Sequence, residues 1–390
     1  MIPRAALDIL LSSAKAMPIL VLMGPRQSGK TTLAKLAFPD YTYVTLSNRD
    51  TQHFAEEDPR AFLQQYNDRV IIDEAQMAPS LFSYLQELVD QDDTPGRFIL
   101  TGSQNFLLME QVSQSLAGRV ALHKLLPLSL YELSQVNALD ESVDAVMWEG
   151  AYPRVHAQSL QPGQWYADYI TTYLERDVRS LKQISDLSSF QRFLRMCAAR
   201  SGQILNLSSL ANDCGIAVNT AKSWLSVLEA SFIVHLLQPY YNNFNKRLMK
   251  SPKLYFYDTG LICSLLNIQT PEQLSTHHLR GELFETLIVN ECMKFRFNRG
   301  QPQNTYYWRD KTGHEIDMLI DSAGCLGNVE IKSSHTMQSS FVKNLKWFSE
   351  NMSVEHTSSV VYAGDADQHR SDVKVYSWRN VYTLFKEISS

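Results

Sequence analysis

Short apolar runs alternate with amphipathic stretches through the first third of the chain. Five of these runs predict buried strands, and they occupy residues 18–23, 41–48, 70–72, 97–105 and 120–130. Helix-like stretches separate them. Because parallel strands need long crossover connections, this alternation predicts an α/β fold with a parallel sheet that helices cover on both faces.

The middle of the chain has the period of amphipathic helices. Residues 188–202 predict one helix, and residues 206–216 predict a second that begins with good capping residues and ends at Gly215. Residues 217–237 predict a third helix that passes into a strand. A short helix, a glycine turn and a second helix form the helix-turn-helix pattern.

The last third returns to strand alternation after a helix predicted at 280–297. Residues 304–310 predict a strand, and a hairpin follows with a turn near Ala323–Gly324. The side chains predicted to face the core are those of Ile316, Met318, Ile320, Val329 and Ile331. Those predicted to face outward are Glu315, Asp317, Glu330 and Lys332. Strand geometry then places Asp317 opposite Glu330.

Length and composition limit the possible classes of protein. A chain of 390 residues with 44% hydrophobic and 20% charged residues predicts a globular protein of two to four domains. No apolar run approaches the ~20 residues of a membrane helix. The N-terminal apolar patch lacks a small-residue cleavage site, so we expect no signal peptide. Five scattered cysteines without CxxC spacing favour reduced thiols in a cytoplasm and disfavour a zinc site.

The net charge of −5 is unevenly distributed. Residues 161–280 carry more basic than acidic side chains, whereas the regions before and after them carry more acidic ones. If the protein contacts nucleic acid, this middle region is where we expect the contact.

The loop after the first strand, GPRQSGKTT, fits the pattern GxxxxGK[ST] between a strand and a helix. Glycines let the backbone N–H groups face phosphate oxygens at the positive end of a helix. Lys30 would reach the β- and γ-phosphates of ATP, and the Thr31 hydroxyl would bind Mg²⁺. The residues predicted to hold the nucleotide are Gly24, Gln27, Ser28, Gly29, Lys30, Thr31 and Thr32.

Two acidic residues end the strand at 70–72. Asp73 would hold Mg²⁺ through water, and Glu74 would act as general base on the attacking water. The alternative is a strand end with two solvated acids. After the strand at 97–105, Thr101 or Ser103 could contact the γ-phosphate.

This order of motifs resembles the AAA-type ATPases. The resemblance implies that Arg119, at the end of the helix-like stretch 106–119, is an arginine finger for the nucleotide of a neighbouring subunit in a homo-oligomer. A helix-end cation favoured by the helix dipole is the alternative. The matching segments include GPRQSGKTTL, IDEAQ, TGSQNFLL, LAGR and LPLSLYEL.

More narrowly, the chain resembles a large prokaryotic family with an AAA-type front and a poorly characterised C-terminal half. Its further matches are WEGAYPRV, TYLERDVR, KSPKLYFYDTGL and YYWRDKTGHEID. The expected organisation is an ATPase core at 1–135, a helical lid at 136–185, a winged helix-turn-helix at 186–275 and a restriction-endonuclease-like α/β domain at 276–390. Arg154 in the lid could be a second sensor of the nucleotide, or it could form an ordinary salt bridge.

The winged-helix region could bind DNA. Asn219, Thr220, Lys222 and Ser223 would face the major groove. A basic wing tip would contact phosphate through Lys246, Arg247, Lys250 and Lys253. The alternative is a module that joins two domains or binds protein. Asp258 is predicted to cap the helix at 259–266.

The C-terminal carboxylates resemble the PD-(D/E)xK nuclease arrangement. That resemblance implies Mg²⁺ ligands at Glu285, Asp317 and Glu330, with Lys332 activating water. Ile316 stands where many members have proline. Ordinary cross-strand pairing, or a nuclease fold kept as a scaffold, is the alternative.

Together these features predict an Mg²⁺-dependent ATPase of the AAA type, cytoplasmic and not membrane-bound, that acts on DNA or is regulated by it and carries a nuclease-like C-terminal domain. The alternative is an ATP-driven switch that binds protein or promoter DNA and cuts nothing.

Overall fold

The computed structural model describes residues 2–103, 105–174, 186–240, 251–322, 324–352, 354–370 and 373–389. Its contacts divide the chain into two compact units. The first comprises residues 1–128 with the short segments 230–232 and 296–302. The second comprises residues 129–229, 233–295 and 303–390.

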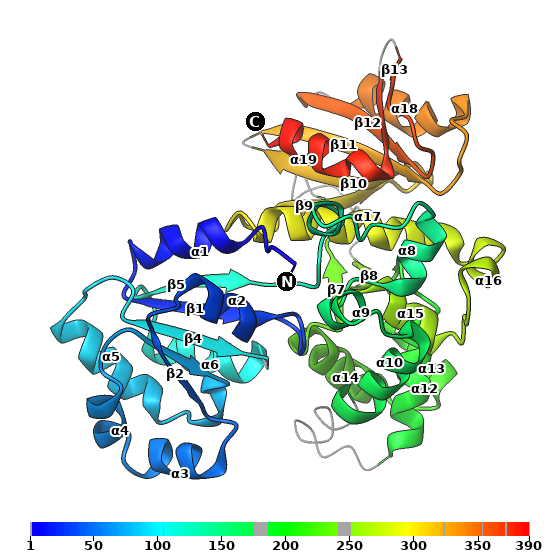
Figure 1. The fold of residues 1–390 in the computed structure, drawn as a ribbon. Helices are drawn as coiled ribbons and strands as arrows, with labels where there is room; N and C mark the ends of the chain where they lie inside the picture. Colours follow the sequence, from blue (N-terminus) through cyan, green and yellow to red (C-terminus); the bar gives the residue numbers. More distant parts are fainter. Residues whose placement is uncertain are drawn as a thin grey trace. The chain divides into compact units, whose positions relative to one another are not determined.

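A five-stranded parallel sheet forms the centre of the first unit (Figure 1). Its strands are β1 (Ile19–Met23), β2 (Thr42–Thr45), β3 (Val70–Asp73), β4 (Phe98–Gly102) and β5 (Val120–Lys124), in the order β2-β3-β4-β1-β5. Every residue of β1, β3 and β4 is buried. The predicted parallel sheet is therefore confirmed, with a strand at each of the five predicted places.

Helices surround this sheet: α1 (Leu7–Ala14), α2 (Lys30–Ala37), α3 (Arg49–Glu57), α4 (Pro59–Gln65), α5 (Leu81–Gln91) and α6 (Asn105–Ser115), with a 3-10 turn at Ala75–Met77. Leu10 of α1 and Leu33 of α2 share one core with Leu20, Ile71 and Ile99 of the sheet. Because side chains alternate along a strand, the neighbouring buried residues point to the opposite face. Both faces of the sheet are thus covered.

The second unit begins with short helices. They are α7 (Leu130–Ser134), α8 (Val143–Glu149), α9 (Pro153–Ala157), α10 (Pro162–Tyr169) and a π-helical turn at Ile170–Leu174. The Ser129 hydroxyl and the Glu132 carboxylate form a reciprocal capping box at the start of α7. Arg176 and Arg179, which fall within the segment 136–185 expected to form a lid, lie outside the described residues.

Three helices and a small sheet follow. They are α12 (Leu187–Ala198), α13 (Leu207–Cys214), α14 (Val218–Ala230), and the strands β6 (Gln203–Ile204), β7 (Val234–Leu237) and β8 (Lys253–Phe256). The sheet order is β6-β8-β7, all antiparallel. Asn206 caps α13, and Gly215 ends it in the left-handed conformation at φ 68°. Both residues do what the sequence predicted.

Two further helices, α15 (Thr259–Leu265) and α16 (Pro271–Ser275), precede the C-terminal part. Asp258 accepts a hydrogen bond from the Leu261 N–H at 2.9 Å, so its predicted role as the cap of α15 is confirmed.

A long helix, α17 (Arg280–Phe297), leads into a mixed six-stranded sheet. Its strands are β9 (Thr305–Arg309), β10 (Glu315–Ser322), β11 (Cys325–Lys332), β12 (His356–Tyr362), β13 (Gln368–Arg370) and β14 (Val373–Ser377), in the order β13-β14-β12-β11-β10-β9. The accompanying helices are α18 (Lys343–Asn351) and α19 (Val381–Ile388), with 3-10 turns at Ser339–Val342 and Trp378–Asn380.

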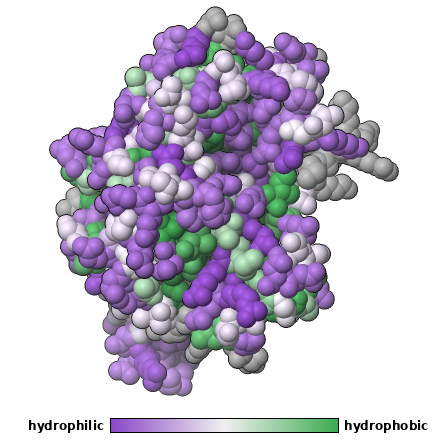
Figure 2. Space-filling model, turned by 90° about the vertical axis from the view of Figure 1, so that its right-hand side faces the viewer, coloured by the Kyte–Doolittle hydropathy of each residue, from purple (hydrophilic) through white to green (hydrophobic). Residues whose placement is uncertain are grey.

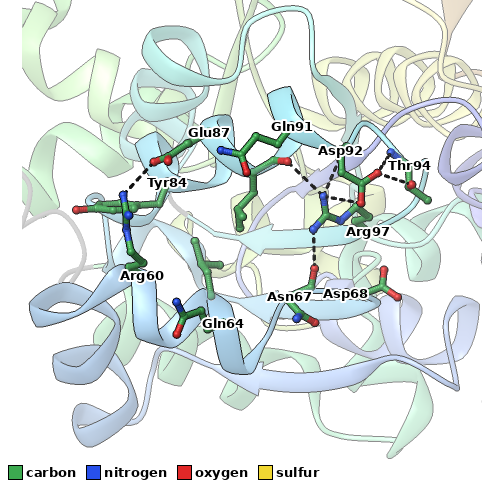
Figure 3. Close-up of a pocket in the computed structure, with 12 residues that line it drawn as sticks. Arg60, Gln64, Asn67, Asp68, Tyr84, Glu87, Gln91, Asp92, Thr94 and Arg97 are labelled. Carbon is green, nitrogen blue, oxygen red and sulfur yellow. Dashed lines mark hydrogen bonds and ion pairs between the residues drawn. The ribbon is translucent and has the colours of Figure 1, made fainter.

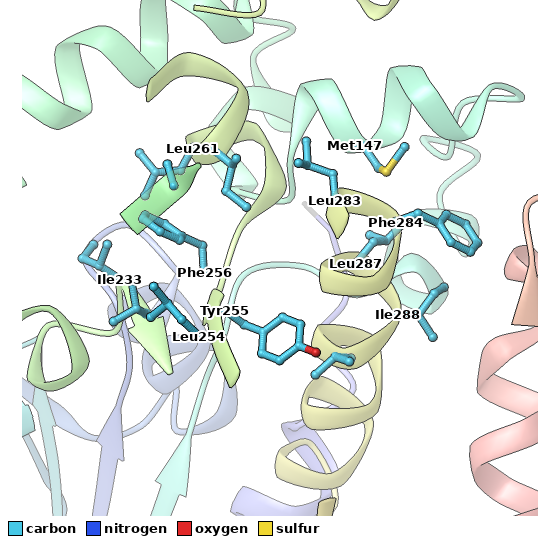
Figure 4. Packing of buried hydrophobic residues seen from close by; sticks show 14 of the residues in the cluster. Met147, Ile233, Leu254, Tyr255, Phe256, Leu261, Leu283, Phe284, Leu287 and Ile288 are labelled. Carbon is cyan, nitrogen blue, oxygen red and sulfur yellow. The ribbon is translucent and has the colours of Figure 1, made fainter. Parts of the chain in front are cut away.

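One continuous hydrophobic core runs through the second unit, from Leu130 to Phe385. Figure 4 shows part of it, where Leu283, Phe284 and Leu287 of α17 pack with neighbours that include Tyr255 of β8. The three regions predicted after residue 135 therefore share a core. The boundaries near 185 and 275 stay a prediction.

Hydrophilic residues dominate the face drawn in Figure 2. In the described part of the chain, the large hydrophobic side chains that stand exposed are those of Leu36, Met77, Leu122 and Val218. Across the described ranges no helix combines the length and the apolar character needed to cross a membrane.

Candidate functional site

The loop between β1 and α2 has the backbone that a phosphate cradle requires. Gln27 and Gly29 have φ angles of 61° and 93°, and Gly24 has a φ of 154°. A Cβ on Gly24 would lie 2.1 Å from the carbonyl oxygen of Leu125, so only glycine fits there. The glycines of the motif are thus needed both for conformation and for close packing.

Lys30 is buried at the start of α2. Its Nζ donates to the carbonyl oxygens of Gly24, at 3.0 Å, and Pro25, at 2.8 Å. Burial lowers the pKa of Lys30 to about 8, although the nearby Glu74 and Asp73 oppose the shift. The Lys30 ammonium therefore lies at the loop between β1 and α2, where the sequence predicted that ATP phosphates bind.

Two buried polar atoms of the same loop have no hydrogen-bond partner in the described part of the chain, Gln27 Oε1 and Ser28 Oγ. Buried polar groups normally have partners, so such atoms fit a loop that binds a polar ligand. Thr32, in contrast, lies exposed on α2.

Three hydroxyl groups hold the Asp73 carboxylate. Thr31 Oγ1 donates to Oδ1 at 2.9 Å, Tyr43 donates to Oδ2 at 2.9 Å, and the Thr101 hydroxyl also donates to Oδ1. Burial, together with Asp73, raises the pKa of Tyr43 to about 12, so the phenol keeps its proton. The Nζ of Lys35 lies 3.4 Å from the centre of the Tyr43 ring.

Glu74 stands at the end of β3 in the left-handed conformation, with φ 57° and ψ 45°. Its Oε2 accepts from Ser103 Oγ at 3.1 Å and from the side-chain amide of Gln76. A Cβ on Gly102 would lie 2.4 Å from Oε1 of Gln76, so a glycine in β4 makes room for this amide. The predicted general base and the predicted γ-phosphate contact are therefore hydrogen-bonded to each other.

Three residues that support this site had no role in the sequence prediction. Arg4 donates to the carbonyl oxygen of Ser28 at 2.6 Å and to that of Leu126 at 2.7 Å, and so connects the loop to the segment after β5. The other two are Tyr43 and Gln76. Gln76 had a visible signal, since it follows Glu74 by two residues; Arg4 had none.

Arg119 has a partner within its own chain. Its Nε lies 2.5 Å from Oδ1 of Asp90 and its Nη2 lies 2.9 Å from Oδ2, a two-pronged ion pair with α5. The role of Arg119 in a neighbouring subunit stays a prediction. Arg154 belongs to α9 in the second unit and donates to Gln158 Oε1 at 3.3 Å. Its assignment to the nucleotide also stays a prediction.

A separate pocket of about 640 Å³ lies in the first unit between α4 and α5 (Figure 3). The Arg97 guanidinium at its wall donates to the carbonyl oxygens of Asn67, at 2.9 Å, and Asp92, at 2.7 Å. Arg60 pairs with Glu87 at 3.4 Å. These contacts are internal to the pocket wall, and no predicted site residue lines it.

The parallel sheet of the first unit and the loop between β1 and α2 define a P-loop domain that is similar to those of AAA-type ATPases. The family described as "AAA domain" matches residues 16–134. Two domains of unknown function, DUF8612 and DUF4143, match residues 140–272 and 280–381.

Two curated relatives extend over most of the chain. An uncharacterized protein of Mycobacterium tuberculosis and one of Mycobacterium bovis are each 33% identical over 325 residues, which cover 82% of this chain and 71% of the relative. The chain belongs to the same family as these mycobacterial proteins.

Two solved structures are distantly similar to this chain. A Walker-type ATPase of Pyrococcus abyssi is 16% identical with a TM-score of 0.45, covering 68% of this chain and 96% of that one. DnaA of Aquifex aeolicus, bound to AMPPCP, is 11% identical with a TM-score of 0.30, covering 57% and 85%. At these TM-scores neither superposition supports a functional conclusion.

The predicted nuclease hairpin forms with the predicted register. Met318 pairs with Val329 and Ser322 with Cys325, so the next pair along is Asp317 and Glu330. Asp317 Oδ2 accepts from the Ile331 N–H at 2.8 Å. The Lys332 Nζ lies 2.9 Å from that Asp317 oxygen and 2.5 Å from Glu330 Oε2. Of the predicted turn, Ala323 lies outside the described residues.

The predicted facing of this hairpin is wrong in two respects. The pairing of β10 with β9 shifts between Ile316 and Leu319, which is a β-bulge. Ile316 therefore joins the core of Leu319, whereas Met318 and Ile320 join the core of α17. In addition, the polar face is covered, because Glu330 is only 1% exposed.

The carboxylates of this region are paired with lysines. Glu285 accepts from Lys253 Nζ at 2.8 Å and from the Tyr255 hydroxyl at 2.5 Å. Burial raises the pKa of Glu330 to about 9, with Asp317 adding to the shift and Lys332 opposing it. Within the ranges that the structure describes, no three His, Cys, Asp or Glu residues are grouped so as to hold a metal ion.

Lys253 was predicted at an exposed wing tip, and that prediction is wrong. The residue lies in β8 and is 3% exposed, and its ammonium pairs with Glu285 of α17 and Glu315 of β10. The other predicted tip residues, Lys246, Arg247 and Lys250, lie outside the described residues.

The start of α14 presents a polar face. Asn219 and Lys222 are exposed, and Thr220 and Ser223 are half-buried. On the same helix Ala221, Trp224 and Leu225 are buried in the core. The four residues predicted to contact DNA are thus accessible in full or in part.

Proposed function

We propose that this protein is an Mg²⁺-dependent ATPase whose nucleotide cycle controls DNA binding by its second unit. The observation that carries the ATPase part is the 2.9 Å hydrogen bond from Thr31 to Asp73. It joins the first residue after the phosphate-loop lysine to the acid that ends β3, the two groups expected to hold Mg²⁺.

The residues present fit Mg²⁺ and ATP. Lys30 supplies a positive charge at the loop, and the unpartnered Ser28 hydroxyl can donate a hydrogen bond there. Bound Mg²⁺ would neutralise the phosphate charge. Thr31 and Asp73 would hold it, and Gly24 to Thr32 would hold the phosphates.

In this proposal Glu74 takes the proton of the attacking water. Its carboxylate is oriented by Ser103 and Gln76, so a water that displaces or shares one of these donors would meet an acceptor already in place. Ser103 would also sense whether the γ-phosphate is present, because a hydrogen bond from Ser103 to this phosphate would replace its hydrogen bond to Glu74.

The DNA part of the proposal rests on α14 and on the helix-strand order around it. That order, from α12 through β8, is the one expected of a winged helix. The exposed Asn219 and Lys222 lie on the second of its paired helices. Charge reversal at Lys222 should weaken DNA affinity and flatten its salt dependence. Unchanged binding would remove α14 from the proposal.

A second candidate function is metal-dependent DNA cleavage by the C-terminal sheet. The observation in its favour is that Asp317, Glu330 and Lys332 lie together. The ion pair between Lys253 and Glu285 weighs against metal-dependent cleavage, because it engages one of the predicted metal ligands. We therefore favour nucleotide-controlled binding without cleavage. DNA cutting in Mg²⁺ or Mn²⁺ that is lost in Asp317→Ala and Lys332→Ala would reverse that preference.

Phosphate release from ATP tests the ATPase part. Lys30→Ala should abolish it. Lys15→Ala is the matched control, because Lys15 is an exposed lysine at the end of α1 and should leave turnover unchanged. Hydrolysis that survives Lys30→Ala would contradict the proposal.

A further inference from the structure

A buried lysine lies where the C-terminal carboxylates meet. Lys253 Nζ lies 2.8 Å from Glu285 Oε1 on α17 and 2.6 Å from Glu315 Oε1 on β10. The Lys253 side chain is 4% exposed. The ammonium thus bridges α17 and β10 through two glutamates that are thirty positions apart in sequence.

Burial of an ammonium is costly unless carboxylates surround it. Burial alone would lower the pKa of Lys253, but Glu285, Tyr255, Asp317 and Glu315 together hold it well above its usual value. Tyr255, in the same strand, donates to the very oxygen of Glu285 that Lys253 contacts. The ammonium is therefore a fixed positive charge of this cluster.

The other carboxylates of the cluster have cations as well. Glu315 also pairs with Arg309, at 3.1 Å, and Asp317 pairs with Lys332. A divalent ion at Glu285 and Asp317 would have to enter beside the Lys253 ammonium and compete with it for the Glu285 oxygen. The predicted metal-ligand set therefore does not fit a metal ion in this arrangement.

The backbone of Lys253 is also firmly held. β8 is the central strand of its sheet, and Lys253 pairs with Ile204 on one side and Leu237 on the other. Just beyond β7, the Tyr240 N–H donates to the Tyr307 carbonyl oxygen in β9 at 2.7 Å. The small sheet is thus joined to β9 by its backbone and to α17 and β10 by the Lys253 ammonium.

We propose that Lys253 is the built-in cation of this cluster: its ammonium takes the place of a divalent ion and fastens the β6-β8-β7 sheet to helix α17 and strand β10. The inference rests on the favoured form of the proposed function, in which the second unit binds DNA and does not cut it. It explains how the three carboxylates of Glu285, Glu315 and Asp317 can lie together around one buried side chain. In the described part of the chain these carboxylates are not grouped to hold a metal ion while the ammonium is present. Removal of the ammonium should let them close in around a divalent cation.

Mn²⁺ binding to the full-length, nucleotide-free chain tests this inference, with free Mn²⁺ counted by its EPR signal. Three chains are compared: native, Lys253→Arg, which keeps the charge, and Lys253→Met, which keeps an unbranched side chain without charge. Each is measured again with Asp317→Asn, so that Mn²⁺ bound elsewhere cancels. In the native and Lys253→Arg chains, adding Asp317→Asn should leave the amount of bound Mn²⁺ unchanged. The Lys253→Met chain should bind about one more Mn²⁺ than the native chain, and adding Asp317→Asn should remove that ion.

If Asp317→Asn removes one bound Mn²⁺ from the native chain, the inference is overturned. It is also overturned if Lys253→Met folds but binds no additional Mn²⁺. If Lys253→Met aggregates, the comparison of the native chain with the Asp317→Asn chain decides. Equal amounts of bound Mn²⁺ support the inference, and one Mn²⁺ fewer on the Asp317→Asn chain overturns it. ATP is absent throughout, so the result is independent of the Lys30→Ala test of the ATPase.

Discussion

The hydroxyl of Thr31 donates a hydrogen bond to Oδ1 of Asp73 across 2.9 Å. The two residues are 42 positions apart in sequence, one at the start of α2 and the other at the end of β3. Strand β4 separates β1 from β3, so the contact depends on the order of strands in the sheet. The same carboxylate is held from its other side by Tyr43, which leads to the first prediction.

Tyr43→Phe removes one of three hydroxyl donors to Asp73 and leaves the ring in place. A hydrogen bond of this kind contributes about 1–2 kcal/mol, so the Mg²⁺ concentration for half-maximal ATP hydrolysis should rise roughly five- to thirtyfold. Maximal turnover at saturating Mg²⁺ should change little. Tyr84→Phe, on α5, is the control. A fall in maximal turnover with no change in Mg²⁺ requirement would refute a role in positioning Asp73.

The pKa of Lys30, lowered by burial to about 8, predicts a pH dependence of ATP binding. Below that pKa the lysine is already charged and binds phosphate without taking up a proton. Above it the free protein holds a neutral lysine, while bound phosphate favours the charged form. ATP affinity should therefore fall as pH rises through about 8, approaching tenfold per pH unit.

Calorimetry at pH 8.5 in two buffers of different ionisation enthalpy measures the proton taken up when ATP binds. With a pKa of about 8, we expect uptake of roughly three-quarters of a proton per ATP at this pH and roughly one-quarter at pH 7.5. Affinity and proton uptake that stay level across this range would show that Lys30 is not the titrating group.

Gly24→Ala places a methyl group 2.1 Å from the Leu125 carbonyl oxygen, at a φ of 154°. Either the loop or the segment after β5 must move, so ATP affinity should fall at least tenfold. Gly163→Ala on α10 is the control, because nothing lies within 4 Å of the added Cβ and its φ is not positive. Tight ATP binding by Gly24→Ala would mean that the loop can shift without cost.

Asp258→Ala should destabilise the second unit. The carboxylate accepts from the Tyr166 hydroxyl at 2.5 Å, the Ala151 N–H at 2.8 Å and the Leu261 N–H at 2.9 Å. Loss of a buried carboxylate that holds three donors should cost about 3 kcal/mol or more in free energy of unfolding, measured with urea. Asp168→Ala, an exposed residue of α10, should change it by less than about 0.5 kcal/mol. Equal effects of the two substitutions would contradict the assigned role of Asp258.

Much of the first unit could be predicted because its signals are local. Each apolar run became a strand, and Asp73 and Glu74 follow one directly. The supporting residues could not be found in this way. Tyr43 meets Asp73 only because β2 pairs with β3, and Arg4 meets Ser28 only through the folded loop.

In the second unit, the alternating pattern of the hairpin predicted the pairing of β10 with β11 correctly, but it did not predict correctly which side chains face the core. A bulge near Asp317 adds one residue to β10, and no feature of the alternating sequence distinguishes it from a regular strand. Lys253 was placed on a basic tip because neighbouring lysines and an arginine precede it. Its burial depends on Glu285 and Glu315, which come from distant elements.

The central claim, that Glu74 activates water at an Mg²⁺–ATP site formed by the loop and β3, is tested most directly by Glu74→Gln. The amide is the same size and can still meet Ser103, but it cannot accept the proton of water. Binding of Mg²⁺–ATP should stay within a few-fold of native, while phosphate release should fall at least a hundredfold, as for loss of a general base. Native turnover in Glu74→Gln would contradict the account.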